Sequence, residues 1–96
     1  MPKGYWIASV TVTDPDKFKD YADLAPAAFK KFGGTFLARG GKHVVLEGDG
    51  RARNVIIEFA SLEVAQECHR SPEYQAAKAK RDGAALMTMV IVEGVA

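Results

Sequence analysis

The stretch GYWIASVTVTDPDKF, residues 4–18, decides the fold, because an alternating apolar pattern runs directly into a helix start. Over residues 4–13, large apolar and β-branched side chains recur at every second position, which is typical of a β-strand. Asp14 and Pro15 then form a helix N-terminus, since aspartate accepts hydrogen bonds from the free N–H groups of the first turn and proline suits the first helical position. The stretch therefore predicts a strand followed at once by a helix.

An apolar stripe with spacings of three and four residues continues this helix for nearly five turns. The stripe consists of Phe18, Tyr21, Ala22, Ala25, Ala28, Phe29 and Phe32. Gly33-Gly34 ends it, as expected where a left-handed cap is needed. Pro26 interrupts it, because it has no N–H to bond the Ala22 carbonyl and costs about 3 kcal/mol inside a helix. We therefore expect a kink, or two short helices, at residues 24–26.

The rest of the chain alternates between strand and helix patterns separated by glycine, serine and proline signals. We predict a strand over 35–39, broken at Gly40-Gly41 and resumed over 42–48, a turn over 48–52, a strand over 53–60, a helix from Ser61 to about Arg70, a helix from Ser71-Pro72-Glu73 to near Gly83, and a strand over 85–93. The order β-α-β-β-α-β predicts an α+β, ferredoxin-like fold with an antiparallel four-stranded sheet and helices on one face.

Ninety-six residues and 48% apolar side chains allow one domain, residues 1–96, that buries roughly 60–65% of its unfolded surface. Thirteen Lys and Arg against twelve Asp and Glu leave a formal charge of +1, without the excess of positive charge typical of nucleic-acid binding. One cysteine allows neither an internal disulfide nor a zinc cluster. No apolar run is long enough to span a membrane, so we expect no membrane partner and a cytoplasmic setting.

The hairpin of the second and third strands predicts which side chains share a face of the sheet. If Gly48 pairs with Arg53, Val44 lies opposite Ile57 and His43 lies opposite Glu58. The face away from the helices then holds much apolar surface, with either Met87, Met89 and Ile91 or Leu86, Val90 and Val92 added by the last strand. So much apolar surface rarely faces water in a small protein. We therefore predict a homodimer that packs sheet on sheet.

Several blocks together resemble a known family. These are YWIASVTVTDPDKFKDYADLAP, KFGGTFLARGGKHVVLEG, VIIEFASLEVAQECHRSPEYQAAKAKR and VIVEG, which span Tyr5 to Gly94. The chain resembles domain-of-unknown-function family 1330, DUF1330, within the dimeric α/β-barrel superfamily. The resemblance implies a ferredoxin-like subunit and a dimer but no established reaction. The sequence departs from the family pattern at Cys68-His69, where aromatic residues are common.

The strongest candidates for chemistry are His43 and Glu58, because a carboxylate beside an imidazole could transfer protons near neutral pH. The alternative is a cross-strand ion pair that holds the hairpin in register. Arg39, beside the flexible Gly40-Gly41, could bind a carboxylate with both arms of its guanidinium group, or form a salt bridge within the protein. Tyr5 and Ser9 are candidate ligand-binding residues on the face away from the helices.

Other notable side chains are expected to be structural. Arg81 is expected to stabilise the end of its helix, and Cys68 and His69 point about 100° apart on a helix, so they cannot act as a pair. Tyr21 and Tyr74 lie at helical spacing among apolar residues and are expected in the core with bonded hydroxyl groups. No set of residues has metal-ligand spacing, and no glycine cluster matches a phosphate loop, so we expect no metal and no cofactor.

Two functions remain open at this point. The first is a small homodimeric domain that binds a small organic molecule in a shielded cavity without turnover. The alternative is a cofactor-independent monooxygenase or isomerase acting on a small aromatic or cyclic metabolite. In that case His43 and Glu58 would transfer protons, and Arg39 or Tyr5 would polarise the substrate. The alternative rests on analogy of fold.

Overall fold

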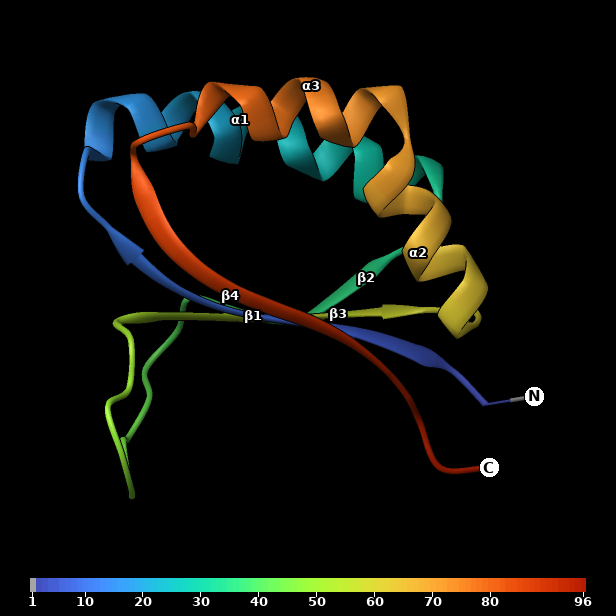
Figure 1. The fold of residues 1–96 in the computed structure, drawn as a ribbon. Coiled ribbons are helices and arrows are strands. Elements are labelled where there is room, and N and C mark those ends of the chain that lie inside the picture. Colours follow the sequence, from blue (N-terminus) through green and yellow to red (C-terminus); the bar gives the residue numbers. More distant parts are fainter. Residues whose placement is uncertain (1) are drawn as a thin grey trace.

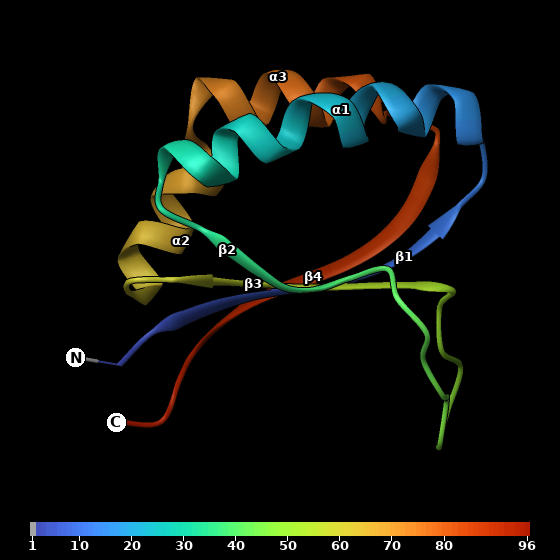
Figure 2. The same ribbon diagram turned by 180° about the vertical axis from the view of Figure 1, so that it is seen from behind.

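The computed structural model describes residues 2–96 as one sheet with three helices on one face (Figure 1). The elements are β1 Gly4–Val12, α1 Pro15–Lys31, β2 Thr35–Arg39, β3 Arg53–Phe59, α2 Leu62–Arg70, α3 Pro72–Lys80 and β4 Ala85–Glu93. The strands are antiparallel in the order β2-β3-β1-β4. This confirms the predicted α+β, ferredoxin-like fold. We call the sheet face that no described helix covers the open face (Figure 2).

Alternate side chains of the central strand β1 point to the core and to the open face. Trp6, Ala8 and Val10 are buried beneath the helices, while Tyr5 and Ile7 lie on the open face. The core is strongly aromatic around Trp6, whose ring meets those of Phe29 and Tyr74 edge-on at centroid distances of 5.1 and 4.9 Å. Such pairs add stability beyond the burial of their area.

Helix α1 begins as predicted, with the Asp14 side chain accepting a 3.2 Å hydrogen bond from the Lys17 N–H. It ends before Gly33, whose φ of 74° places it in the left-handed region. The division into two short helices, one of the two outcomes expected at Pro26, is wrong: α1 is one helix of 17 residues with Pro26 inside it. Its buried stripe packs against α3 and the core, which outweighs the local cost of the proline.

The predicted strand over residues 42–48 is wrong, and with it the hairpin register. β2 ends at Arg39, and Thr35, not His43, is the partner of Glu58 in β3. Gly40 adopts a φ of 66°, which turns the backbone out of the ladder. Residues 40–52, here called the arm, then run away from the body past the open face (Figures 1 and 2). The arm has no strand pairing among the described residues.

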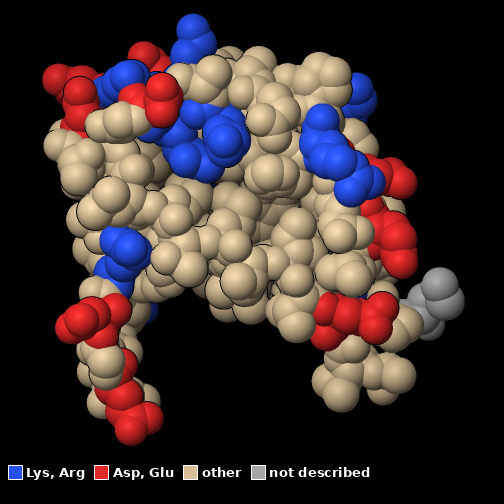
Figure 3. All heavy atoms as spheres, viewed as in Figure 1, with Lys and Arg blue, Asp and Glu red and all other residues tan. Residues whose placement is uncertain are grey.

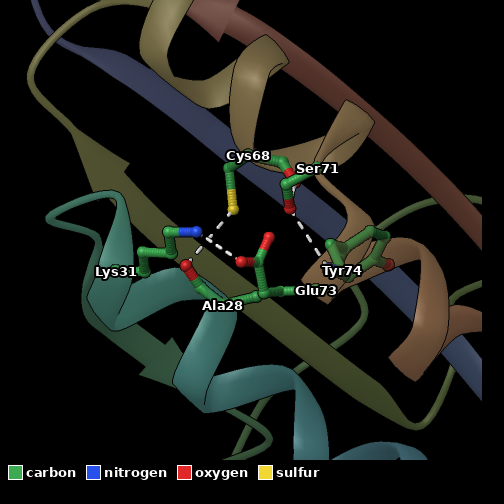
Figure 4. A network of polar contacts seen from close by, with 6 residues as sticks. All are labelled: Ala28, Lys31, Cys68, Ser71, Glu73 and Tyr74. Carbon is green, nitrogen blue, oxygen red and sulfur yellow. Dashed lines mark hydrogen bonds and ion pairs between the residues drawn. The ribbon is translucent and has the colours of Figure 1, made fainter.

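Ser61 and Ser71 cap the N-termini of α2 and α3, as predicted. The Ser71 hydroxyl accepts from the Tyr74 N–H at 3.1 Å and donates to the Cys68 carbonyl at 2.6 Å (Figure 4). One serine therefore ends α2 and starts α3, which fixes the bend between them. The Cys68 thiol points to the Ala28 carbonyl of α1 at 3.7 Å. Nearby at the surface, Lys31 of α1 forms an ion pair with Glu73 of α3.

The sequence left open which alternate side chains of the last strand, β4, lie on the open face, and the structure answers this. Met87, Met89 and Ile91 pack against the core. The side chains at the alternate positions therefore lie on the open face. The exposed apolar residues there are Ile7, Leu86, Val90 and Val92. The open face of the sheet is thus as apolar as the alternation predicted.

Candidate functional site

A narrow cleft lies between α1 and the helix-covered face of the sheet. Its free space is about 450 Å³ including the open mouth, but only about 40 Å³ is wide enough for the centre of a water molecule. The lining consists of Trp6, Ala8, Val10, Phe18, Tyr21, Ala22, Ala25, Pro26, Phe29, Phe36, Arg39, Arg53, Val55, Ile57 and Met87. An apolar cleft with few polar groups is the usual form of a small-molecule site.

Arg39 and Arg53 carry the only charges in this lining. Each guanidinium group lies over an aromatic ring of the cleft, at 4.3 Å from the Phe36 centroid for Arg39 and 5.9 Å from the Phe18 centroid for Arg53. Within residues 2–96, neither has a carboxylate oxygen within 4.0 Å. Stacking on rings holds a guanidinium plane in place while its N–H groups stay free to donate. The cleft therefore has positive charge without a protein counter-charge.

The backbone explains why both arginines lie at the cleft. Arg39 pairs with Val55 in the ladder, while Arg53 starts β3. A side chain at Gly40 would lie 2.5 Å from a terminal nitrogen of Arg53, so the glycine also leaves room for that guanidinium group. Arg39 was a predicted ligand-binding residue and does line the cleft. Arg53 was missed, because from sequence alone it is only the first residue of a strand.

The other predicted site residues lie elsewhere. On the open face, the Tyr5 hydroxyl donates to a Glu58 carboxylate oxygen at 3.1 Å, and Ser9 donates to the Asn54 side-chain oxygen at 3.0 Å. This bond to Glu58 raises the pKa of Tyr5 above its ordinary value. The structure therefore joins Tyr5 with Glu58, but on the side of the sheet away from the cleft and Arg39.

His43 lies in the arm, not opposite Glu58 as the predicted register required. It lines a hollow of about 910 Å³ between the arm and the open face, together with Ser9, Arg51 and Asn54 but without Glu58. In the space-filling view the arm stands clear of the body and carries acidic side chains (Figure 3). The expected proton-transfer pair of His43 and Glu58 is thus not assembled by the hairpin.

Cys68 and His69 have the structural surroundings expected of them. Cys68 is buried, and burial raises the pKa of its thiol to about 12, so it is a poor nucleophile at neutral pH. The His69 ring packs against the rings of Trp6 and Tyr74 at centroid distances of 5.6 and 5.2 Å. Burial, together with nearby positive charges, lowers the pKa of His69, so its neutral form is favoured.

Tyr21 and Tyr74 are core residues with bonded hydroxyl groups, as expected, but Tyr21 also lines the cleft. In residues 2–96 no group of three or more His, Cys, Asp or Glu side chains could hold a metal ion. Over the same residues, none of the helices combines the length and apolar character needed to cross a membrane. The cleft with its two arginines is therefore our candidate site.

Comparison with protein families gives one match. The model described as "Domain of unknown function (DUF1330)" matches residues 3–95, almost the whole chain. A search of curated proteins finds no match.

Solved structures resemble the chain along nearly its whole length. A protein of unknown function from Rhodopseudomonas palustris has a TM-score of 0.76 at 17% identity, with 99% of this chain and 84% of that chain covered. A dimeric protein of unknown function with a ferredoxin-like fold, from Bacteroides fragilis, has 0.65 at 14% identity, with 95% of each chain covered. SnoaB, a cofactor-independent oxygenase from Streptomyces nogalater, has 0.62 at 9% identity, with 100% and 96% covered. At these identities the likeness shows a shared fold.

Proposed function

Because the chain belongs to the DUF1330 family, for which the family description names no reaction, the function must be argued from its own site. We propose that the protein is a homodimer whose subunits each bind a small apolar carboxylic acid in the cleft between α1 and the sheet. One observation carries the ligand: Arg39 and Arg53, each over an aromatic ring and without a carboxylate partner within residues 2–96, bring two guanidinium groups to an otherwise uncharged cleft.

The chemistry of the lining determines the class of ligand. Aromatic and aliphatic walls favour an apolar body, since each square ångström removed from water is worth about 25 cal/mol. A guanidinium fork favours a carboxylate, which it can bind through two parallel hydrogen bonds. Arg39 is exposed and Arg53 is half-buried, so these bonds form at a site that water also reaches. An apolar carboxylic acid can contact both the apolar walls and the two arginines of the cleft.

The width of the cleft limits the shape of the ligand. Little of its free space exceeds the width of a water molecule, so a flat ring or a single alkyl chain fits better than a branched or fused ring system. A ring would still require α1 to move slightly outward. This movement would have to loosen the packing of α1 on the core, where the Phe29 ring lies 5.1 Å from that of Trp6.

Binding of benzoate should depend on both arginines. We expect Arg39→Gln and Arg53→Gln each to weaken benzoate binding by about tenfold, the usual loss for one charge-assisted bond at a partly exposed site. Benzamide, which has the same ring without the charge, should bind weakly to every variant. The single Trp6 indole N–H resonance reports binding by NMR, because Trp6 lines the cleft and is the only tryptophan.

Arg70→Gln is the matched control, since Arg70 is an exposed arginine at the end of α2 and does not line the cleft. It should leave benzoate affinity unchanged. Equal binding of benzoate to wild type and to the Arg39→Gln/Arg53→Gln double variant would refute the proposal, as would the absence of any benzoate binding at millimolar concentration.

The homodimer is supported by the open face. Its exposed apolar side chains, Ile7, Leu86, Val90 and Val92, come from the two adjacent strands β1 and β4. Among the polar side chains of this face, Tyr5 is hydrogen-bonded to Glu58 and Ser9 to Asn54. Burial of hydrogen-bonded neutral groups costs less than burial of free ones. A face of this kind suits a second copy of the same sheet.

The arm supports the same assembly. Val44 and Leu46 are 79% and 87% exposed, and both lie in the segment that runs past the open face. At the base of the arm, Arg51 donates to the Thr11 hydroxyl at 3.1 Å and the Gly40 N–H donates to the Asn54 carbonyl at 2.8 Å. These bonds direct the arm toward the space that a second sheet would fill. The Bacteroides fragilis relative, described as dimeric, agrees with this proposal.

The enzymatic alternative has less support. SnoaB has the same fold and is described as a cofactor-independent oxygenase, but a fold at 9% identity does not carry a reaction with it. His43 and Glu58, the residues that would transfer protons, lie in separate surroundings on the side of the sheet away from the cleft. Binding without turnover is therefore the function we propose.

A further inference from the structure

Three polar side chains form a connected cluster that reaches the cleft through Tyr21. The hydroxyl groups of Tyr21 on α1 and Tyr74 on α3 lie 3.0 Å apart. Arg81, the residue that ends α3, donates to the Tyr74 hydroxyl at 3.4 Å, and its guanidinium carbon lies 5.0 Å from the centre of the Tyr21 ring. Both tyrosines are buried, and only Tyr21 lines the cleft.

The direction of these hydrogen bonds leaves one proton unused. A guanidinium group can only donate, whereas each phenol has one proton to donate. One phenolic proton bonds the other hydroxyl oxygen, so the second has no acceptor among residues 2–96. Where Tyr74 donates to Tyr21, the free proton is that of Tyr21, and Tyr21 is the one of the two residues that lines the cleft.

Arg81 adds positive charge to this cluster without a matching anion. Within residues 2–96 it has no carboxylate oxygen within 4.0 Å, and its Nε–H is buried without any partner. A cation against two phenols makes their protons better donors and favours partial negative charge on an acceptor nearby. Burial raises the pKa of Tyr21 above its ordinary value, so the hydroxyl keeps its proton at neutral pH.

We propose that Tyr21 is a second polar anchor of the cleft and donates a hydrogen bond to a carbonyl or similar acceptor oxygen of the ligand, with Tyr74 and Arg81 as positioning residues. The inference rests on the proposed function and narrows its ligand class. The ligand is an apolar acid with a carboxylate at one end, for Arg39 and Arg53, and an acceptor oxygen at the other. An aromatic or aliphatic keto acid has this arrangement.

Two probes of matched shape test the inference. In 4-isopropenylbenzoate a CH2 group takes the place of the ketone oxygen of 4-acetylbenzoate, and in both the carbon bonded to the ring is trigonal, so the two acids differ mainly in the acceptor. We expect the wild type to bind 4-acetylbenzoate about tenfold more tightly, and Tyr21→Phe to abolish this preference while leaving the affinity for 4-isopropenylbenzoate unchanged. Calorimetric titration measures both affinities. Tyr5→Phe, the same chemical change on the open face, should keep the full preference.

Arg81→Met provides a second variant, which removes the cation and leaves both hydroxyl groups. It should reduce the preference severalfold and leave 4-isopropenylbenzoate binding as it is, an effect that a purely structural role would not produce. If Tyr21→Phe does not fold, Arg81→Met decides the question alone. Equal weakening of both probes, or an unchanged preference in both variants, would overturn the role of Tyr21 while leaving the proposed function intact. If the wild type binds neither acid, the proposed function and this inference fail together.

Discussion

Val90→Glu is expected to convert the proposed homodimer into a monomer. In a two-fold symmetric dimer the substitution places two carboxylates in the interface at once, each without a partner charge. An unpaired charge that is removed from water costs several kcal/mol, so the dimer should weaken by more than about a thousandfold. Val90 is 52% exposed in the single chain, so the same glutamate can remain hydrated there. Folding of the monomer should therefore survive.

Sedimentation equilibrium over a wide concentration range measures the effect. Val95→Glu is the matched control, because Val95 is 99% exposed beyond the end of β4 and should leave the dimer intact. Circular dichroism of Val90→Glu should match the wild type. A wild-type protein that stays monomeric at high micromolar concentration would contradict the assembly, and so would a Val90→Glu variant that still dimerises with unchanged affinity.

The open face was predictable because its signal is local. In a strand, the face on which each side chain lies follows from its parity, so β1 and β4 together reveal apolar side chains on both faces. The helices cover one face of the sheet, so the apolar side chains of the open face need a second surface to pack against. The arm was not predictable in this way. The apolar, β-branched run over residues 44–46 resembles a strand, but the positive φ of Gly40 sends it out of the sheet, and no local pattern distinguishes a bulge from an exit.

The cleft was only partly predictable, for a related reason. Arg39 was predicted to bind a ligand because it precedes two glycines, and it does line the cleft. Tyr21 was interpreted as a core residue, since an apolar stripe on a helix looks the same whether it borders a cleft or not. Its significance depends on Arg81, sixty positions later in the sequence, and on the packing of α1 beside α3. Only the tertiary structure brings these groups together.

Gly4→Ala is expected to destabilise the protein strongly although it adds a single methyl group. Gly4 is the first residue of β1, and a Cβ there would lie 2.3 Å from the Ser61 carbonyl oxygen and 2.7 Å from the Leu62 backbone nitrogen. These atoms belong to backbone rather than to flexible side chains, so β1 or the start of α2 must shift. The shift disturbs the packing of His69 of α2 against Trp6. We expect a loss of about 3 kcal/mol in the free energy of unfolding.

Gly41→Ala makes the cause testable, because it adds the same methyl group where no atom lies within 4 Å and where the backbone is not in the left-handed region. The control should change the free energy of unfolding by less than about 0.5 kcal/mol. Urea unfolding at one protein concentration, in the Val90→Glu background, separates this effect from dissociation of the dimer. If both alanines cost the same, the loss reflects glycine replacement in general, and the close contact between β1 and the start of α2 is not what makes Gly4 necessary.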